Sequence, residues 1–142
     1  MKRKDFLKSA GVLAASTLLF KTEAFANQEA PLRIGLIGAN GMGWSNLNAI
    51  LKINNVTCTA LCDVDENVLN KRAAELEQKN IKVKKYIEYK DLLKDPNIDA
   101  VIVGTPDHWH CMMMVDAVKA GKHVYVEKPL GNSIKECEVM LA

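Results

Sequence analysis

The sequence lacks a long apolar run, a paired-cysteine pattern and a large net charge, and each absence excludes a class of protein. Its longest apolar stretch, residues 10–20, has 11 residues, whereas a helix that spans a bilayer needs about 20. The four cysteines show no Cys-x-x-Cys spacing, so we predict neither a metal site nor a redox pair. Residues 27–142 hold 14 basic and 15 acidic side chains, so nucleic acid is not an expected partner.

The first 26 residues have the parts of an export signal. A basic start precedes the apolar stretch, and Ala24-Phe25-Ala26 supplies the small residues of a cleavage site. We therefore predict an exported bacterial protein, periplasmic or extracytoplasmic, with no membrane contact after cleavage; a short core helix is the alternative. Residues 3–8 resemble the twin-arginine motif, but Lys4 replaces the second arginine, so the general secretory route stays open.

After a linker at residues 27–31, short apolar runs alternate with longer periodic segments. The runs predict strands at residues 32–37, 56–62, 83–86, 100–103 and 123–126. The periodic segments predict helices at about residues 42–53, 65–79, 89–94, 107–120 and 133–142. This alternation indicates an α/β fold over residues 32–142, a doubly wound parallel sheet of the Rossmann type. Cys58 and Cys62 would lie on one face of a strand, about 13 Å apart and too distant for a disulfide.

The borders of two helices carry capping residues. Asp65 is placed to cap the helix after the second strand, and Ser133 with Glu136 has the spacing of a capping box. The last helix runs into Ala142 with no glycine, asparagine or proline to end it. We therefore expect the domain to be truncated at its C-terminus and to belong to a longer protein.

A glycine-rich turn follows the first predicted strand. Gly38 and Gly43 fill the first and last positions of a dinucleotide fingerprint, Asn40 replaces its middle glycine, and Gly41 and Met42 complete the turn. Among the residues other than glycine, asparagine best tolerates left-handed backbone angles, so the replacement is compatible with such a turn. Backbone N–H groups of the next helix would then face the phosphates of a dinucleotide. An ordinary loop is the alternative.

Asp63 ends the second strand region, twenty residues after Gly43. Dinucleotide-binding folds place an acidic residue there to accept hydrogen bonds from the adenosine ribose hydroxyls. Its charge would repel the 2′-phosphate of NADP, and Val64 offers no compensating positive charge. NAD is therefore the expected cofactor and NADP is disfavoured. A strand-end cap is the alternative role for Asp63.

Polar residues also follow the fourth strand, in the segment Gly104-Thr105-Pro106-Asp107-His108-Trp109-His110. This is the carboxyl edge of the sheet, where open α/β folds bind ligands. His108 and His110 stand two residues apart and would face different sides of a helix, so they are not a natural metal pair. Structural and catalytic roles stay open for both. Trp109 belongs either to the core or to the wall of a substrate pocket.

Glu127 and Lys128 follow the fifth strand and precede Pro129. Burying a charged pair at the end of a strand is unfavourable unless the charges have a use. Lys128 would lie near the nicotinamide, where it could donate a hydrogen bond or a proton to a substrate oxygen. The alternative is a surface turn.

In this order, the motifs resemble the glucose–fructose oxidoreductase / inositol dehydrogenase family (Gfo/Idh/MocA). The resemblance covers about residues 32–142. It rests on the glycine turn, the acid after the second strand and three later segments: Thr105 to His110, Ala120 to Val124, and Glu127-Lys128-Pro129.

The resemblance implies hydride transfer between NAD(P) and a carbon of a sugar or polyol, in a protein with a C-terminal α/β domain that this sequence does not contain. It implies that Lys128 helps to activate the substrate hydroxyl and that the Lys128–Pro129 bond is cis. Thr105 and Pro106 would pass along the cofactor, and His108 and Glu127 are further expected contacts. A homo-oligomer formed through the C-terminal domain is also expected.

Two other functions remain open. Some exported relatives are glycosidases that keep NAD bound and oxidise and re-reduce the sugar around an elimination. A non-catalytic module that senses a dinucleotide or sugar is the third hypothesis.

Overall fold

The computed structural model describes residues 30–142, so the predicted export signal and most of the linker lie outside the described residues. The elements in chain order are β1 (Leu32–Ile37), α2 (Gly41–Ile50), β2 (Val56–Cys62), α3 (Glu66–Glu77), β3 (Lys84–Tyr86), α4 (Tyr89–Leu93), β4 (Ala100–Val103), η1 (Asp107–Trp109), α5 (His110–Lys119), β5 (His123–Val126) and α6 (Ile134–Leu141). Every predicted strand and helix is present, and the helix expected at 107–120 divides into η1 and α5. No helix in this part of the chain has the length and apolar character to cross a membrane.

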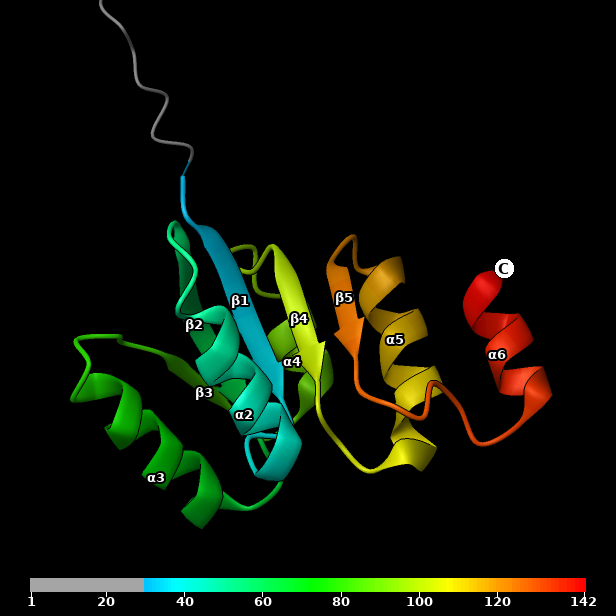
Figure 1. The fold of residues 1–142 in the computed structure, drawn as a ribbon, viewed down its shortest axis with the longest axis horizontal. Helices are drawn as coiled ribbons and strands as arrows, with labels where there is room; N and C mark the ends of the chain where they lie inside the picture. The colour runs from blue at the N-terminus through cyan, green and yellow to red at the C-terminus, as the bar shows by residue number, and fades with distance from the viewer. Residues whose placement is uncertain (1–29) are drawn as a thin grey trace, which may run out of the picture.

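The five strands form one parallel sheet in the order β3-β2-β1-β4-β5 (Figure 1). The chain first adds strands on one side of β1 and then returns to add β4 and β5 on the other side. The carboxyl ends of β1 and β4 therefore diverge into loops on opposite faces, which makes a crevice at that edge. This confirms the predicted doubly wound sheet.

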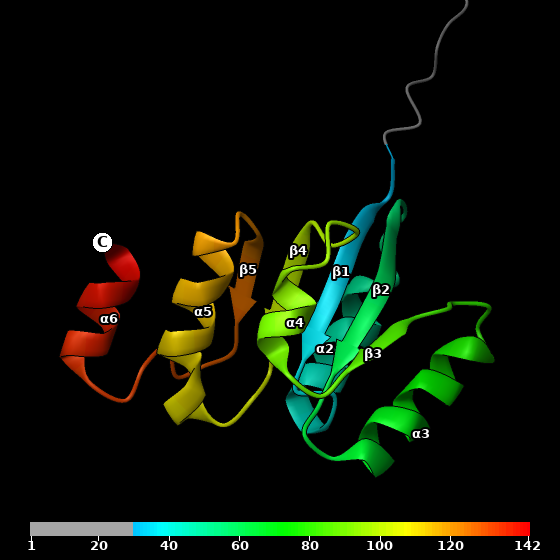
Figure 2. The ribbon, with the colours of Figure 1, turned by 180° about the vertical axis from the view of Figure 1, so that it is seen from behind.

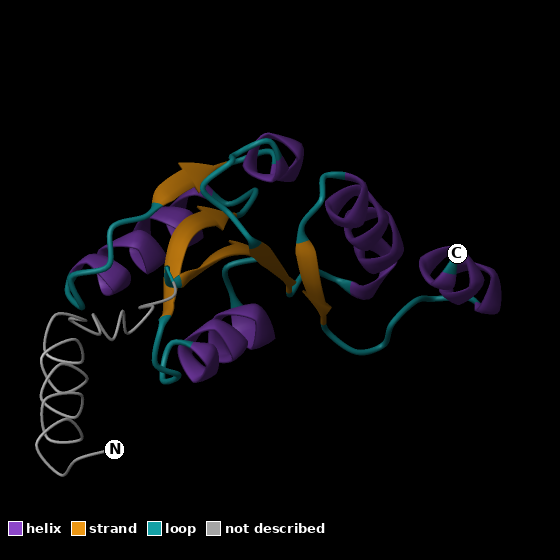
Figure 3. Ribbon diagram, turned by 90° about the horizontal axis from the view of Figure 1, so that it is seen from above, coloured by secondary structure: helices purple, strands orange, loops and turns teal. Residues whose placement is uncertain are grey.

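Helices cover both faces of the sheet (Figure 3). On one face α2 and α3 bury Leu47, Leu69 and Leu76 against the sheet. On the other face α4 and α5, which lie in front in Figure 2, bury Leu92 and Met113. Because both faces are covered, the central strands β1 and β4 are largely apolar, as parallel strands between two helical layers are expected to be. The short edge strand β3, Lys-Lys-Tyr, is the exception.

The two cysteines of β2 lie on opposite faces, and the prediction that they share one is wrong. Cys58 packs in the cluster under α2 and α3, whereas Cys62 packs in the cluster under α4 and α5. The reason is an irregularity at Thr59, where the β1–β2 register passes from Ile34–Cys58 to Gly35–Ala60. An extra residue reverses the alternation of side chains along a strand. Burial raises the pKa of both thiols to about 12.

Both predicted caps are present. An Asp65 carboxylate oxygen accepts from the N–H of Asn67 at 2.8 Å at the start of α3. The Ser133 hydroxyl accepts from the N–H of Glu136 at 3.2 Å at the start of α6. The Glu136 carboxylate reaches back to the N–H of Asn132, one residue before the position that a capping box uses.

The buried Asp95 joins the segment before β4 to β3. Its carboxylate accepts hydrogen bonds from the N–H of Asn97 at 2.9 Å, the Tyr86 hydroxyl at 2.7 Å and the Lys84 ammonium at 3.0 Å. These donors, led by the Asn97 N–H, hold the pKa of Asp95 well below its ordinary value. The charged form is thereby stabilised only in the folded protein.

We predict that Asp95→Asn lowers the free energy of unfolding by about 2 kcal/mol at neutral pH, since hydrogen bonds to a buried charge are lost. The folded-state pKa is depressed, so the wild-type contribution is present above the unfolded value of about 3.9 and disappears as the pH falls toward the folded value. Urea unfolding measured between pH 2 and pH 7 should therefore show that the free energy of unfolding falls less steeply with decreasing pH in the variant than in the wild type. Asp91→Asn, which breaks the exposed ion pair with Lys94, is the control and should leave the profile unchanged. Parallel profiles for wild type and Asp95→Asn would contradict this account.

Candidate functional site

A cleft of about 440 Å³ opens at the carboxyl ends of β1, β2 and β4. It brings together five residues that the sequence predicted as cofactor contacts, from three separate segments: Gly38, Asn40, Asp63, Thr105 and Pro106. The N–H of Gly38 donates to the Cys62 carbonyl at 2.9 Å and the N–H of Gly104 donates to the Ile37 carbonyl at 2.8 Å. These bonds continue the ladder beyond the strands and hold the three segments side by side.

Three glycines let α2 approach the sheet closely. A Cβ on Gly43 would overlap the carbonyl oxygen of Gly38, and a Cβ on Gly104 would overlap the Cα of Gly43. Gly38 also has a φ of 86°, a left-handed angle that side chains disfavour. The sequence did not single out Gly104 as part of this contact, because its glycine neighbour comes from a distant segment.

Asn40 has extended backbone angles, with φ −119° and ψ 175°. The left-handed angles of the turn fall on two glycines, Gly38 and Gly41, the latter with φ 48°, so the tolerance of asparagine for such angles is not needed. The Asn40 side-chain oxygen accepts from the Arg72 guanidinium at 3.2 Å. That guanidinium stacks on the Trp44 ring at 4.7 Å and pairs with Glu75, so α3 holds the outer side of the turn.

The N-terminus of α2 is open to a ligand. No side chain caps this helix, and its first turn holds no acidic residue. Its uncompensated N–H groups and the positive end of its dipole suit an anion such as a pyrophosphate. Met42 is in this first turn, so its backbone N–H is one of the groups without a partner inside the helix. The chain therefore fits the phosphates of a dinucleotide at this point.

The Asp63 carboxylate is fixed beside the turn. One oxygen accepts from the N–H of Ala39 at 2.8 Å and the other accepts from the N–H of Asp65 at 3.0 Å. A carboxylate offers about four acceptor positions, so two remain for ribose hydroxyls. The strand-end cap and the ribose contact, weighed as alternatives for Asp63, are compatible with each other.

Apolar side chains form the walls of the cleft. Val64, Ile87 and Trp109 line it and are 85%, 40% and 39% exposed. Trp109 therefore belongs to a pocket wall and not to the core. The sequence missed Ile87, because the strand before it, β3, has only three residues and gives a weak pattern.

Thr105 and His108 follow β4 but lie differently. Thr105 is half-buried, and its hydroxyl contacts the sulfur of Met113 at 3.6 Å. His108 is exposed, with its ring 3.7 Å from the Asp107 carboxylate, and it is not among the residues that line the cleft. His110, two residues later, is buried, and both of its ring nitrogens lie at hydrogen-bond distance from backbone carbonyl oxygens. The sequence had left the roles of both histidines open.

The loop after β5 lies next to the cleft, because the N–H of Glu127 donates to the Val103 carbonyl of β4 at 3.0 Å. The Glu127 carboxylate accepts from the Asn46 amide at 3.0 Å and the Tyr125 hydroxyl at 3.1 Å. The Asn46 contact is the main reason that the pKa of Glu127 lies below its ordinary value. Lys128 is exposed, and the Lys128–Pro129 bond is cis, as the resemblance implied.

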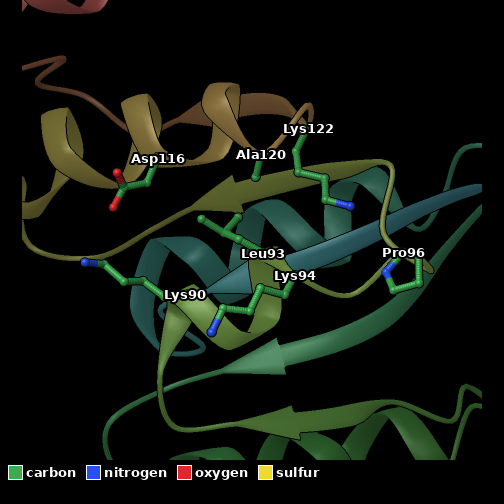
Figure 4. Close-up of a pocket in the computed structure, with 7 residues that line it drawn as sticks. All are labelled: Lys90, Leu93, Lys94, Pro96, Asp116, Ala120 and Lys122. Atoms are coloured by element: carbon green, nitrogen blue, oxygen red, sulfur yellow. The ribbon is translucent and has the colours of Figure 1, made fainter.

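A second hollow, of about 640 Å³, lies away from this edge, between α4 and α5 (Figure 4). Three of its four charged side chains have hydrogen-bond or ion-pair partners. Lys122 donates to the Asp95 and Ile98 carbonyls, Lys94 pairs with Asp91, and Asp116 accepts from the Tyr89 hydroxyl. Within residues 30–142, no three His, Cys, Asp or Glu side chains gather as a metal site would require.

The glycine turn, the uncapped helix and the acid after β2 are the parts of a dinucleotide site, and comparison with known proteins identifies their family. Residues 32–142 match the model of the Gfo/Idh/MocA oxidoreductase family, described as having an NAD-binding Rossmann fold. The chain belongs to this family. The predicted family, Rossmann fold and NAD cofactor class are thereby confirmed.

Curated relatives and solved structures agree with this assignment. The chain is 32% identical to an alpha-N-acetylgalactosaminidase of Shewanella oneidensis, over 95% of its own length and 35% of that protein. It is 29% identical to a glycosyl hydrolase family 109 protein of Shewanella putrefaciens, with the same coverage. Its fold matches the myo-inositol 2-dehydrogenase of Lactobacillus plantarum with a TM-score of 0.70 and 34% identity, over 78% of this chain and 32% of that one. The chain thus spans about a third of the length of these proteins.

We predict that Gly43→Ala weakens NADH binding at least about tenfold and destabilises the fold by about 1–3 kcal/mol, because the added methyl group overlaps the Gly38 carbonyl and forces α2 away from β1. The control is Gly121→Ala, at a turn glycine with a left-handed φ of 73° and open space where the Cβ would lie. It should lower stability by about 1 kcal/mol and leave NADH affinity unchanged. Thermal unfolding and fluorescence titration with NADH measure both effects. Wild-type affinity in Gly43→Ala would contradict the close approach.

Proposed function

We propose that this chain is the cofactor-binding part of an enzyme that transfers hydride between NAD and a carbon of a sugar or polyol. One arrangement carries the proposal. The glycine turn leads into a helix, α2, that no side chain caps, and the Asp63 carboxylate is fixed beside this turn. Both lie at a cleft that is next to the loop of Lys128. NAD, when bound, supplies the hydride acceptor or donor. The residues of this chain supply its binding and orientation.

The adenosine half of the cofactor belongs at β2 in this proposal. Asp63 accepts from the ribose hydroxyls and disfavours a 2′-phosphate by its charge. Gly38 and Asn40 leave room for the pyrophosphate, and the N–H groups of Gly41, Met42 and Gly43 bind its oxygens.

The nicotinamide half belongs at β4 and β5. Thr105 and Pro106 line the cleft there and orient the ring, and we keep His108 and Glu127 as further proposed contacts. Lys128 donates a hydrogen bond to the reacting substrate oxygen. Its neutral amine receives the hydroxyl proton when the alcohol is oxidised, and the ammonium group so formed returns that proton when the carbonyl is reduced.

We further propose that the protein is exported to the periplasm. The basic start, the apolar stretch and the Ala24-Phe25-Ala26 site support this. A protein that holds a dinucleotide made in the cytosol must bind it before export, which favours the twin-arginine route for folded cargo. We also retain the proposal of a homo-oligomer, formed through the expected C-terminal domain.

An NAD-dependent glycosidase is the second candidate. Both curated relatives described above carry glycosidase names, and that reaction would use the same cofactor cleft. In it, oxidation and re-reduction of the sugar cancel, so free sugar is released without accumulation of NADH.

The two candidates are separated by one assay on the full-length protein. It is incubated with NAD and either myo-inositol and related polyols and sugars, or p-nitrophenyl α-N-acetylgalactosaminide. The proposal predicts NADH absorbance at 340 nm in step with substrate loss, and Lys128→Ala should lower that rate about a hundredfold or more while NADH binding persists. Release of p-nitrophenol without net NADH would instead establish the glycosidase. Cofactor binding without turnover of any substrate would contradict both enzyme candidates and support a non-catalytic binding module.

We predict that Asp63→Ala weakens NAD binding by about tenfold to a hundredfold, since a hydrogen bond to a charged group is lost, and narrows the preference for NAD over NADP. The matched control is Asp65→Ala, two residues away, which removes the α3 cap but no residue of the cleft. It should lower stability by about 1 kcal/mol and keep NAD affinity. Isothermal titration with NAD and NADP measures both. Equal NAD affinity in Asp63→Ala and wild type would show that the ribose lies elsewhere.

A further inference from the structure

His110 connects the two loops that flank the proposed reaction site. It is the first residue of α5 and only 1% exposed. Its Nδ1 lies 2.7 Å from the Pro129 carbonyl oxygen and its Nε2 lies 2.9 Å from the Thr105 carbonyl oxygen. One ring thus spans the loop after β4, which lines the cofactor cleft, and the loop after β5, which carries Lys128.

The chemistry of the ring suits this connection. Both partners are carbonyl oxygens, which only accept hydrogen bonds, so each contact needs an N–H on the ring. Imidazole presents its two nitrogens on separated positions of a rigid plane. A neutral ring donates to one carbonyl and a protonated ring donates to both. A phenyl ring would fill the same space and donate to neither.

The position of the two acceptors decides what the bridge does. Pro129 directly follows Lys128 across the cis bond, and Thr105 is a wall of the cleft. The Lys128 loop has one other described tie to β4, from the N–H of Glu127 to the Val103 carbonyl. The two ties lie on either side of Lys128, and together with the bond from the Asn46 amide to the Glu127 carboxylate they fix the position of its backbone beside the cleft.

We propose that His110 is a positioning residue that holds Lys128 against the nicotinamide end of the cleft through the Pro129 carbonyl. It does not touch the substrate. The inference rests on the proposed function of Lys128, and it assigns a role to the histidine of the Thr105-to-His110 segment that is not among the proposed cofactor contacts. Misplacing a catalytic group by about 1 Å can lower a rate about a hundredfold, so loss of the bridge should affect kcat more than binding.

The test uses His110→Phe and His110→Gln in the full-length protein. His110→Phe keeps the packing and removes both donors, while His110→Gln keeps one amide group, which can hold one carbonyl. The matched control is Lys122→Met, because Lys122 also bridges two carbonyls, those of Asp95 and Ile98, at the other end of α5. Its loss should reduce stability without changing turnover.

Three measurements are compared: kcat with the substrate that turns over in the assay above, NADH affinity, and amide hydrogen exchange. We expect His110→Phe to lower kcat about a hundredfold and NADH affinity less than about threefold. Exchange should rise at residues 104–105, 127–128 and 130–131 and stay unchanged at residues 38–44. His110→Gln should recover at least about tenfold of the lost rate, and if His110→Phe does not fold, the same comparison is made between His110→Gln and wild type, with an expected loss in kcat of about tenfold.

Each result decides the inference. Wild-type kcat in His110→Phe, or a rate loss matched by Lys122→Met, would overturn it. If no substrate turns over even in the wild type, the proposed function fails separately, and the exchange data still decide the bridge. A rise confined to the two loops would support it, whereas unchanged or uniformly raised exchange would overturn it.

Discussion

The structure depends on the close approach of α2 to the carboxyl ends of β1 and β4. Gly38, Gly43 and Gly104 meet there without a side chain between them, so the first turn of α2 starts directly at the edge of the sheet. A helix that begins so close to the sheet leaves its N–H groups facing the crevice where the chain changes direction. The other features of the site, from the Asp63 carboxylate to the loop of Lys128, are arranged around this helix start.

The two helical layers keep the crevice in place. The sheet buries one set of side chains under α2 and α3 and another under α4 and α5, so each strand is fixed on both faces. At the carboxyl edge, backbone ladder bonds continue from the strand ends into the loops. Binding groups therefore stand on rigid strand ends, and the ligand meets a preformed surface.

Local patterns of the sequence were sufficient for much of this. Apolar runs and helical periodicity located all the strands and helices, and the spacing from Gly43 to Asp63 placed the acid beside the turn. Other features depend on contacts between distant segments. The β-bulge at Thr59 places Cys58 and Cys62 on opposite faces of the sheet, and no local sequence pattern predicts this bulge.

The same limit applies to the side chains of the site. The tie from Arg72 to Asn40 joins residues 32 apart along the chain, and the contact of Gly104 with Gly43 joins two separate turns. Between His108 and His110 the sequence offered no physical basis for a choice. The fold decides it, because α5 begins at His110 and turns that ring inward while His108 stays in solvent.

The most direct test of the account is an NMR titration of the protein with NADH, followed by its backbone amide shifts. We predict that the largest changes fall at residues 38–43, at Asp63 and Val64 and at residues 104–105, which come together only in the folded cleft. Changes centred on the hollow between α4 and α5, with the glycine turn unaffected, would contradict it.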